Sequence, residues 1–188
     1  MKNTNHNISL IILACREGNR AAQKRLYQLF FSYGMSVALR YSSARTEAEE
    51  ILNESFFKVF SKIDQYDENN EFKKWFRSIL INTSIDYHRK YKKLKTISSE
   101  KPESLEVDHN TAWEGLLYED LLKVIQLLSP GYRVVFNLYA IDGYKHQEIA
   151  EQLNISVGTS RSNYAKARKL LQGHLEKMKD VKKASNGK

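Results

Sequence analysis

The sequence predicts an all-α protein made of two small helical domains joined by a flexible linker. Only 2 prolines and 8 glycines interrupt the 188 residues, so long helices are permitted. Apolar residues recur at amphipathic-helix spacing in extended segments on both sides of residues 95–112. No alternation of apolar and polar residues is strong enough to indicate a sheet. The expected domains span residues 8–94 and 113–178, and a basic tail follows at 179–188.

In the N-terminal domain, long helices are expected at about residues 20–42, 46–63 and 72–92. Thr46 is predicted to be an N-cap, with Glu49 completing a capping box. Opposite the apolar stripe of the helix at 46–63 lies an acidic and aromatic face, composed of Glu50, Asn53, Glu54 and Phe57. Apolar anchors rimmed by charge are typical of protein-docking surfaces. A merely solvated acidic face is the alternative.

The helix at 72–92 has a second face of interest, opposite its apolar side. It is composed of Trp75, Ser78, Asn82, Asp86 and Arg89, and is followed by Lys90, Lys92, Lys93 and Lys95. An aromatic ring, an amide and a run of cations suit single-stranded nucleic acid, whose bases stack on rings while cations follow the backbone. A buried Trp75 and a solvated helix end explain the same residues equally well.

Residues 95–112 have the composition of a flexible linker, with serine, proline and acidic residues in no lasting period. A helix is expected at about 113–128. A second begins at Pro130, since proline fits the first helical position, and ends at Asp142 and Gly143.

A helix–turn–helix pattern completes the C-terminal domain. Helices at 146–153 and about 156–178 are joined by a turn at Asn154, and Ser156 is placed to cap the second. The outward positions of the second helix are polar or basic: Thr159, Ser160, Arg161, Ser162, Asn163, Lys166 and Lys169. Such side chains read base edges and contact phosphates when a helix enters the major groove. A helical hairpin with a solvated basic face is the alternative, but turn, cap and polar face together favour duplex DNA.

Composition favours a polyanionic partner over catalysis. The chain has 30 Lys and Arg against 22 Asp and Glu, a net charge of +8. Glycine-rich phosphate loops, nucleophile elbows and metal-ligand spacings are absent, so no catalytic residue, cofactor, metal or small-molecule substrate is expected. The single cysteine, Cys15, permits no internal disulfide and favours the reducing cytoplasm. No apolar run reaches transmembrane length.

Three segments together carry a family resemblance. AEEILNESFFKVFSKIDQY, FKKWFRSILINTSIDYHRK and LSPGYRVVFNLYAIDGYKHQEIAEQLNISVGTSRSNYAKARKLL stand in an order and spacing that resembles a bacterial sigma factor of the extracytoplasmic-function group. The resemblance spans about Ala22 to Leu175. It implies an RNA polymerase specificity subunit, active in transcription initiation, with only sigma domains two and four.

The resemblance implies roles for individual residues. The stretch 48–60 matches the part that docks on the clamp coiled coil of the largest polymerase subunit, which gives Glu50, Asn53, Glu54 and Phe57 a partner, although Asn53 replaces the usual glutamine. The segment 64–72 matches the loop that captures a flipped base, with Tyr66 and Phe72 as candidates. The candidates for the minus-ten element are Asn82, Asp86, Arg89 and Lys90. Those for the minus-thirty-five element are Thr159, Arg161, Ser162, Asn163 and Lys166.

Partners follow from the same resemblance. They are core RNA polymerase, through its clamp and flap, promoter DNA as duplex and melted strand, and an inhibitory anti-sigma factor of the kind that is often membrane-bound. Asn163 and Ala165 depart from frequent family choices, so no promoter sequence is assigned.

Two other classes of protein are alternatives. A stand-alone helix–turn–helix regulator with a helical sensor domain would bind its operator without polymerase, and the acidic and aromatic face at Glu50–Phe57 disfavours it. An enzyme such as a recombinase or nuclease would need a nucleophile or carboxylate cluster in a cleft. Asp64, Asp67 and Glu68 are expected to be turn residues instead.

Overall fold

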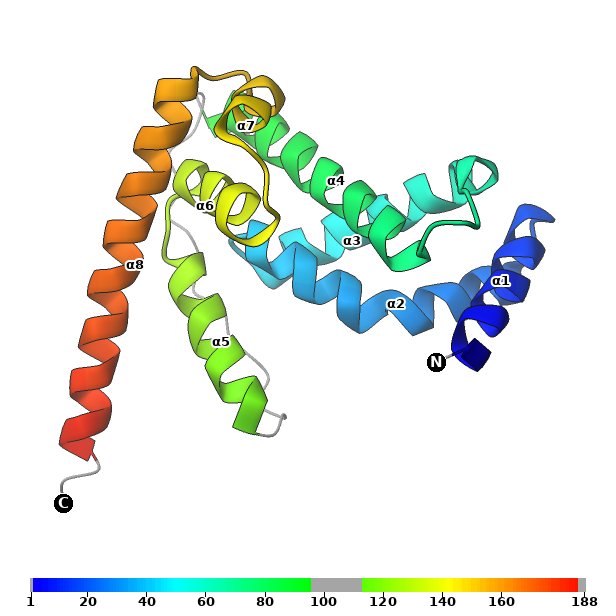
Figure 1. Ribbon diagram of the computed structural model, residues 1–188, viewed down its shortest axis with the longest axis horizontal. Helices are drawn as coiled ribbons and strands as arrows, with labels where there is room; N and C mark the ends of the chain where they lie inside the picture. Colours follow the sequence, from blue (N-terminus) through cyan, green and yellow to red (C-terminus); the bar gives the residue numbers. More distant parts are fainter. Residues whose placement is uncertain (1, 96–112, 186–188) are drawn as a thin grey trace. The chain divides into compact units, whose positions relative to one another are not determined.

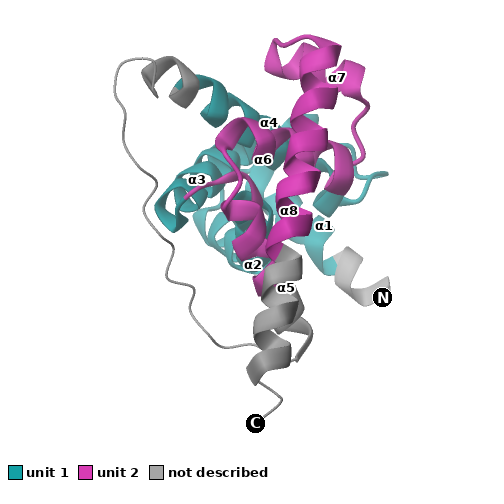
Figure 2. Ribbon diagram, turned by 90° about the vertical axis from the view of Figure 1, so that its left-hand side faces the viewer, with its two compact units in different colours: residues 1–39, 44–98 teal, residues 40–43, 99–188 magenta. Residues whose placement is uncertain are grey.

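The chain folds into two compact helical units, which confirms the predicted all-α class. The computed structural model describes residues 2–95 and 113–185, with side chains at 7–90 and 119–174, and this part of the chain contains helices and no strand. Unit 1 comprises residues 1–39 and 44–98, and unit 2 comprises residues 40–43 and 99–188 (Figure 2). The predicted linker lies outside the described residues from position 96 onward.

Unit 1 is built from the helices drawn in the N-terminal part of the ribbon in Figure 1. Their buried side chains form one aromatic core. The elements of unit 1 are α1 (Lys2–Arg16), α2 (Arg20–Tyr41), α3 (Arg45–Ser61), the 3-10 turn η1 (Ile63–Gln65) and α4 (Phe72–Lys95). The rings of Phe30, Phe56 and Phe72 surround the fully buried Phe76, with centroid separations between 4.7 and 6.0 Å. Burying large aromatic rings dominates the energetics of a small core. This core therefore fixes the relation of α3 to α4.

The predicted capping box at the start of α3 is wrong. The helix begins at Arg45 and its N-cap is Ala44, which makes no side-chain capping bond. Glu49 was expected to close the box, but its carboxylate instead accepts a hydrogen bond from Arg45 Nε at 3.0 Å. An Arg–Glu pair at this spacing stabilises a helix surface, and Thr46 is exposed in the first turn.

Gly34 on α2 permits the close approach of its neighbours. A Cβ at this position would lie 2.4 Å from Leu52 Cδ1 and 3.2 Å from Phe76 Cζ. Leu52 and Phe76 are fully buried, so neither side chain has free space into which it could move. The absence of a side chain at position 34 is therefore a packing requirement.

Gly34→Ala is expected to destabilise unit 1 by about 1–3 kcal/mol, the usual cost of overpacking a filled core. Chemical denaturation followed by circular dichroism measures the loss. Gly131→Ala is the matched control, because a Cβ there meets nothing within 4 Å. Equal stability of the two variants would contradict the packing argument.

Unit 2 is organised around the long helix α8. Its elements are α5 (Trp113–Gln126), α6 (Pro130–Phe136), the π-helical segment η2 (Asn137–Ile141), α7 (His146–Leu153) and α8 (Val157–Ser185). Pro130 stands in the first turn of α6 as predicted. The core joins α5 to α8 through Val124, Ile125, Leu128, Ala167 and Leu171. α8 continues beyond the predicted end at about Met178, so the expected basic tail begins as helix.

Two features of unit 2 have no counterpart in the sequence analysis. Arg133 is 3% exposed, and its guanidinium donates to the carbonyls of Gln126 and Leu128 at 2.7 and 2.9 Å, which caps the end of α5. The helix that begins at Pro130 then widens into η2, where the Asp142 N–H donates to the Asn137 carbonyl at 2.9 Å. Such π segments are rare and are often found at functional sites.

None of the helices in the described part of the chain combines the length and the apolar character needed to cross a bilayer.

Candidate nucleic-acid interface

The predicted helix–turn–helix is present in unit 2. The Lys145 N–H donates to Glu148 Oε2 at 2.7 Å, which caps the start of α7. Asn154 ends α7 with a left-handed backbone (φ 50°), a conformation that asparagine adopts more readily than most residues. The Thr159 N–H donates to Ser156 Oγ at 2.9 Å, so the predicted cap of α8 is confirmed.

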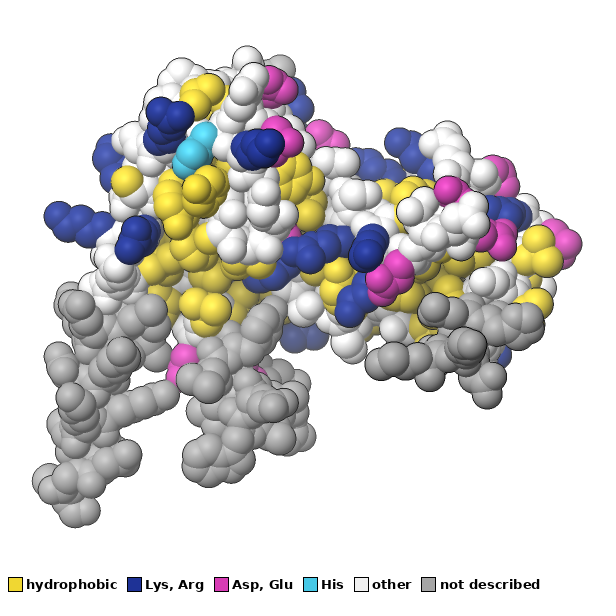
Figure 3. Space-filling view, viewed as in Figure 1, with side chains coloured by type: hydrophobic (Ala, Val, Ile, Leu, Met, Phe, Trp, Pro, Cys, Tyr) yellow, Lys and Arg dark blue, Asp and Glu magenta, His cyan; other side chains and the backbone are white. Residues whose placement is uncertain are grey.

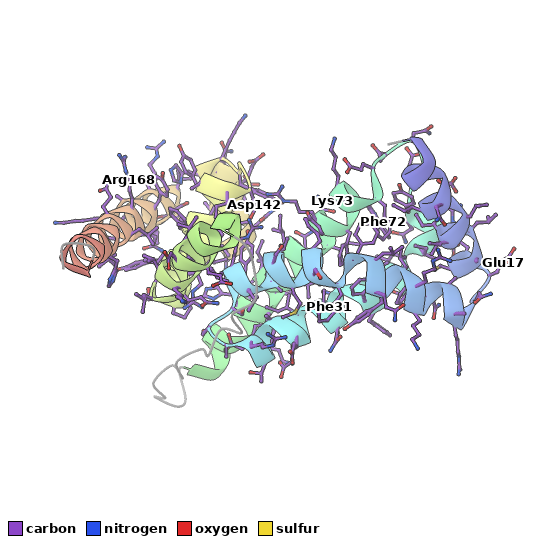
Figure 4. All side chains as sticks on the ribbon, turned by 90° about the horizontal axis from the view of Figure 1, so that it is seen from below. Glu17, Phe31, Phe72, Lys73, Asp142 and Arg168 are labelled. Atoms are coloured by element: carbon purple, nitrogen blue, oxygen red, sulfur yellow. The ribbon has the colours of Figure 1, made fainter. Side chains whose placement is uncertain are left out.

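Most of the predicted reading residues project from the first turns of α8. Thr159, Arg161, Ser162 and Lys166 are exposed, and Asn163 is half-buried. Arg168, which the sequence analysis did not single out, is also exposed and extends this face about two turns beyond Arg161 (Figure 4). Polar and basic groups therefore cover the side of α8 that faces away from the core.

Ser160 is the exception, and its predicted outward position is wrong. Its side chain is fully buried and shares a 3.0 Å hydrogen bond with Nδ1 of His146 on α7. The reason is its helical position, because Ser160 lies on the same side of α8 as the buried Ala167, where the helix packs against α7.

The acidic and aromatic face of α3 is exposed as predicted. Glu50, Asn53 and Glu54 reach the surface, and Phe57 is 68% exposed. The acidic and amide groups are held from other helices: the Tyr87 hydroxyl donates to Glu50 Oε2 at 3.1 Å, and the Tyr27 hydroxyl donates to Asn53 Oδ1 at 3.2 Å. These two bonds pre-orient the face.

A groove between α3 and α4 is here called the α3/α4 groove. It joins this face to part of the polar strip of α4, which consists of Asn82, Asp86, Arg89 and Lys90. Its lining residues are Glu50, Asn53, Glu54, Phe57, Lys58, Thr83, Asp86, Tyr87 and Lys90. Lys58 Nζ lies 3.2 Å from Asp86 Oδ2 and so spans the groove. Helix periodicity predicts faces of single helices, and for that reason Lys58, Thr83 and Tyr87 were not singled out from the sequence.

The polar strip of α4 is available to a ligand. Asn82, Asp86, Arg89 and Lys90 are all exposed. Asp86 is paired with two cations: Arg89 Nη1 lies 3.9 Å from its Oδ1, and Lys58 Nζ lies 3.2 Å from its Oδ2. Trp75, which was predicted on the same face of α4, is half-buried against the rings of Tyr66 and Phe72.

Tyr66 and Phe72 differ from expectation. They are 7% and 3% exposed, and their ring centroids lie 5.5 Å apart in edge-on contact. The ring of Phe72, which is labelled in Figure 4, also contacts Phe30 of α2, with 4.8 Å between the ring centroids. Neither ring has a free face for a stacked base in this conformation, because both gain more from packing in the core. Base contact by these two residues stays a prediction that requires the loop to rearrange.

The loop between η1 and α4 is instead fixed by an arginine from α1. Arg16 donates to Glu68 Oε1 at 2.6 Å and to the Tyr66 carbonyl at 2.8 Å. Within the loop, Asp67 accepts hydrogen bonds from the backbone and side chain of Asn69, as its expected turn role requires. The loop is thus held by Arg16 of α1 and by its own turn bonds.

Among residues whose side chains are described, no group of three or more His, Cys, Asp or Glu is placed to hold a metal ion. On the face drawn in Figure 3, Lys and Arg side chains are distributed among hydrophobic and uncharged ones. Cys15 is buried in unit 1, and burial raises the pKa of its thiol, which leaves it protonated and unreactive.

Comparison with known proteins assigns the two units. Residues 26–94 match the family model for sigma-70 region 2, and residues 118–171 match that for sigma-70 region 4. The extracytoplasmic-function (ECF) RNA polymerase sigma factor SigW of Bacillus subtilis is 33% identical over 141 residues, which cover 69% of this chain and 75% of that protein. The chain belongs to the ECF group of sigma-70 factors. As a sigma factor it acts in transcription initiation, and the alternative of a stand-alone regulator is not favoured.

Further relatives agree with this assignment. The ECF sigma factor SigM of Bacillus subtilis is 28% identical over 149 residues, which cover 78% of this sigma factor and 91% of SigM. The solved structure of the sigma factor RpoE from Bartonella quintana, in complex with the anti-sigma factor NepR, matches with a TM-score of 0.52 at 22% identity. That match covers 94% of this sigma factor and 98% of RpoE, and it supports the fold.

Proposed function

We propose that unit 2 of this sigma factor reads the minus-thirty-five element as duplex DNA through the first turns of α8. The supporting observation is the exposed set Thr159, Arg161, Ser162 and Lys166, presented on a helix whose start is fixed by the Ser156 cap. Arginine reads base edges in a bidentate manner, while hydroxyls and lysine suit phosphates. Asn163 is half-buried and contributes at the edge of this face.

Unit 1 has two tasks in this proposal. Its exposed face, formed by Glu50, Asn53, Glu54 and Phe57, docks on the clamp coiled coil of the largest polymerase subunit. The polymerase flap is contacted by unit 2 instead. The strip formed by Asn82, Asp86, Arg89 and Lys90 engages the minus-ten element. The loop held by Arg16 lies next to the melted strand, where bases are unstacked at a cost of a few kcal/mol.

Polymerase binding presents both readers at a fixed separation. When one of two linked sites binds DNA, the effective concentration of the other site near the DNA rises. The affinity of the pair for the promoter therefore exceeds that of either unit alone. The free energy for melting then comes from binding, and the sigma factor performs no catalytic step of its own. We place this activity in the cytoplasm, where polymerase and promoter are found. We also expect an anti-sigma factor, as RpoE of Bartonella quintana has in its solved complex.

Run-off transcription with core polymerase on genomic fragments tests the proposed function. Purified protein is expected to redirect the polymerase to new start sites. These sites should share one minus-thirty-five sequence and one minus-ten sequence. Tight binding of an operator in the absence of polymerase, with no new start site, would favour the stand-alone regulator.

Arg16→Ala is expected to slow promoter opening severalfold while polymerase binding is unchanged, because the loop loses its contact with α1. The partly exposed Arg16–Glu68 pair contributes only about 0–1 kcal/mol to folding, so unfolding should change little. Permanganate footprinting measures opening. The control is Arg45→Ala, which removes the exposed Arg45–Glu49 pair elsewhere in unit 1. If a pre-melted promoter does not restore the transcription activity of the Arg16 variant, the loop is not involved in melting.

A further inference from the structure

His146 joins the two helices of the DNA-reading motif. It is the first residue of α7, and its Nδ1 lies 3.0 Å from Oγ of Ser160 on α8. Ser160 is fully buried and lies between Thr159 and Arg161, both of which are exposed on the reading face. A contact at Ser160 therefore sets the position of the two reading residues beside it.

An aromatic stack holds the imidazole in place. The ring of His146 lies 4.2 Å from that of Tyr139, with only 10° between the ring planes. Tyr139 belongs to η2, and its ring also contacts Tyr164 of α8 at 4.5 Å. Tyr139 thus stacks on the histidine from within the π segment, an arrangement that sequence spacing did not reveal.

The charges around the ring favour its neutral form in the free protein. Burial, and then the positive charge of Arg161, lower the pKa of His146 below its usual 6.5. The other titratable groups about the ring are Tyr139 and Tyr164, while Lys145 and Glu148 flank it in the first turn of α7. Glu148 Oε2 accepts the Lys145 N–H, so that carboxylate is engaged in capping.

We propose that His146 is a proton-linked positioning residue for duplex binding, which holds the start of α8 against α7 and takes up a solvent proton when a DNA phosphate backbone arrives. The inference rests on the proposed function of unit 2. In a helix–turn–helix, the helix that precedes the reading helix crosses the sugar–phosphate backbone, so His146 at the start of α7 approaches phosphate oxygens. Phosphates offset the charge of Arg161 and favour imidazolium. The charged ring donates from Nδ1 to Ser160 Oγ.

The sign of the pH effect follows from linkage. If the complex binds one proton more than the free protein, duplex affinity rises as the pH falls. The rise occurs between the pKa of His146 in the complex and its lower pKa in the free protein. One proton changes affinity by at most about tenfold per pH unit. For a half-buried residue at the edge of the contact, about a threefold gain between pH 7.5 and pH 6.0 is expected.

The experiment uses holoenzyme on a promoter fragment selected in the run-off assay. Wild type and variant compete for the fragment at each pH, and the ratio of their affinities cancels the pH dependence of the polymerase. His146→Asn keeps a donor near Nδ1 but does not titrate, and His146→Phe keeps the stack on Tyr139 without hydrogen bond or proton. His174→Asn is the matched control, a histidine of α8 outside the stack.

The expected result is that wild type gains about threefold over both His146 variants as pH falls to 6.0, whereas His174→Asn follows wild type. A loss of affinity in the His146 variants that is the same at every pH indicates a merely structural role and overturns the proposal. The proposal is also overturned if His174→Asn loses the gain at low pH to the same extent as the His146 variants. A wild-type holoenzyme that selects no promoter overturns the proposed function itself, which distinguishes that failure from a flat pH profile on a promoter that is selected.

Discussion

Replacing Glu50 and Glu54 together by lysine is expected to abolish binding of this sigma factor to core RNA polymerase. Both carboxylates are exposed on the face of α3 that also presents Phe57. Charge reversal places like charges against a surface complementary to acidic groups, and such contacts cost several kcal/mol, so a loss of about 100-fold or more is expected. The Tyr87 hydroxyl bond to Glu50 is lost as well. Binding of labelled protein to core polymerase without DNA measures the effect.

The control for this variant reverses two acidic residues elsewhere. Glu17 lies just past the end of α1 (Figure 4) and Glu151 lies on α7, and both are exposed. The Glu17→Lys, Glu151→Lys protein has the same net charge as the test variant, so a nonspecific charge effect would appear in both. Unchanged polymerase affinity in the Glu50→Lys, Glu54→Lys protein would refute the docking face.

Arg161→Ala is expected to lower promoter use by about 10- to 100-fold, because a bidentate contact with a base is worth about 1–3 kcal/mol. Arg161 is exposed in the second turn of α8, so its removal leaves no cavity in the core. Affinity for core polymerase should not change. Transcription from a promoter with an intact upstream element measures the loss.

Arg20→Ala provides the control, since it removes an exposed arginine at the start of α2. A fall in polymerase binding in the Arg161 variant would count against a DNA-reading role. Equal promoter loss in both variants would instead indicate that only net charge matters.

Local signals explain what the sequence could predict. Helix periodicity located the long helices, and the cap at Ser156, the proline at position 130 and the turn at Asn154 depend on residues close in sequence. The exposed faces of α3 and α4 follow from the same periodicity, since each is the opposite side of an apolar stripe. Family resemblance then supplied partners that no single helix face indicates.

Tertiary contacts explain what the sequence could not predict. Tyr66 was expected to meet a base because the family resemblance matches its segment to a base-capturing loop, yet its ring packs into the core and Arg16 from a distant helix holds its carbonyl. Ser160 was expected outside because serine is polar, but His146 satisfies it in the interior. The widened turn at Asn137 likewise depends on packing around Tyr139 and Tyr164.

The α3/α4 groove has a consequence for how such a protein can change over generations. Asp86 and Lys90 line the same groove as Glu50 and Phe57. In the function proposed above, a substitution there alters polymerase docking and minus-ten contact at once. Thr159, Arg161 and Ser162 of α8 do not line this groove. Promoter preference is therefore freer to diverge at the upstream element than at the downstream one, and duplicated copies of this gene should acquire new targets first through α8.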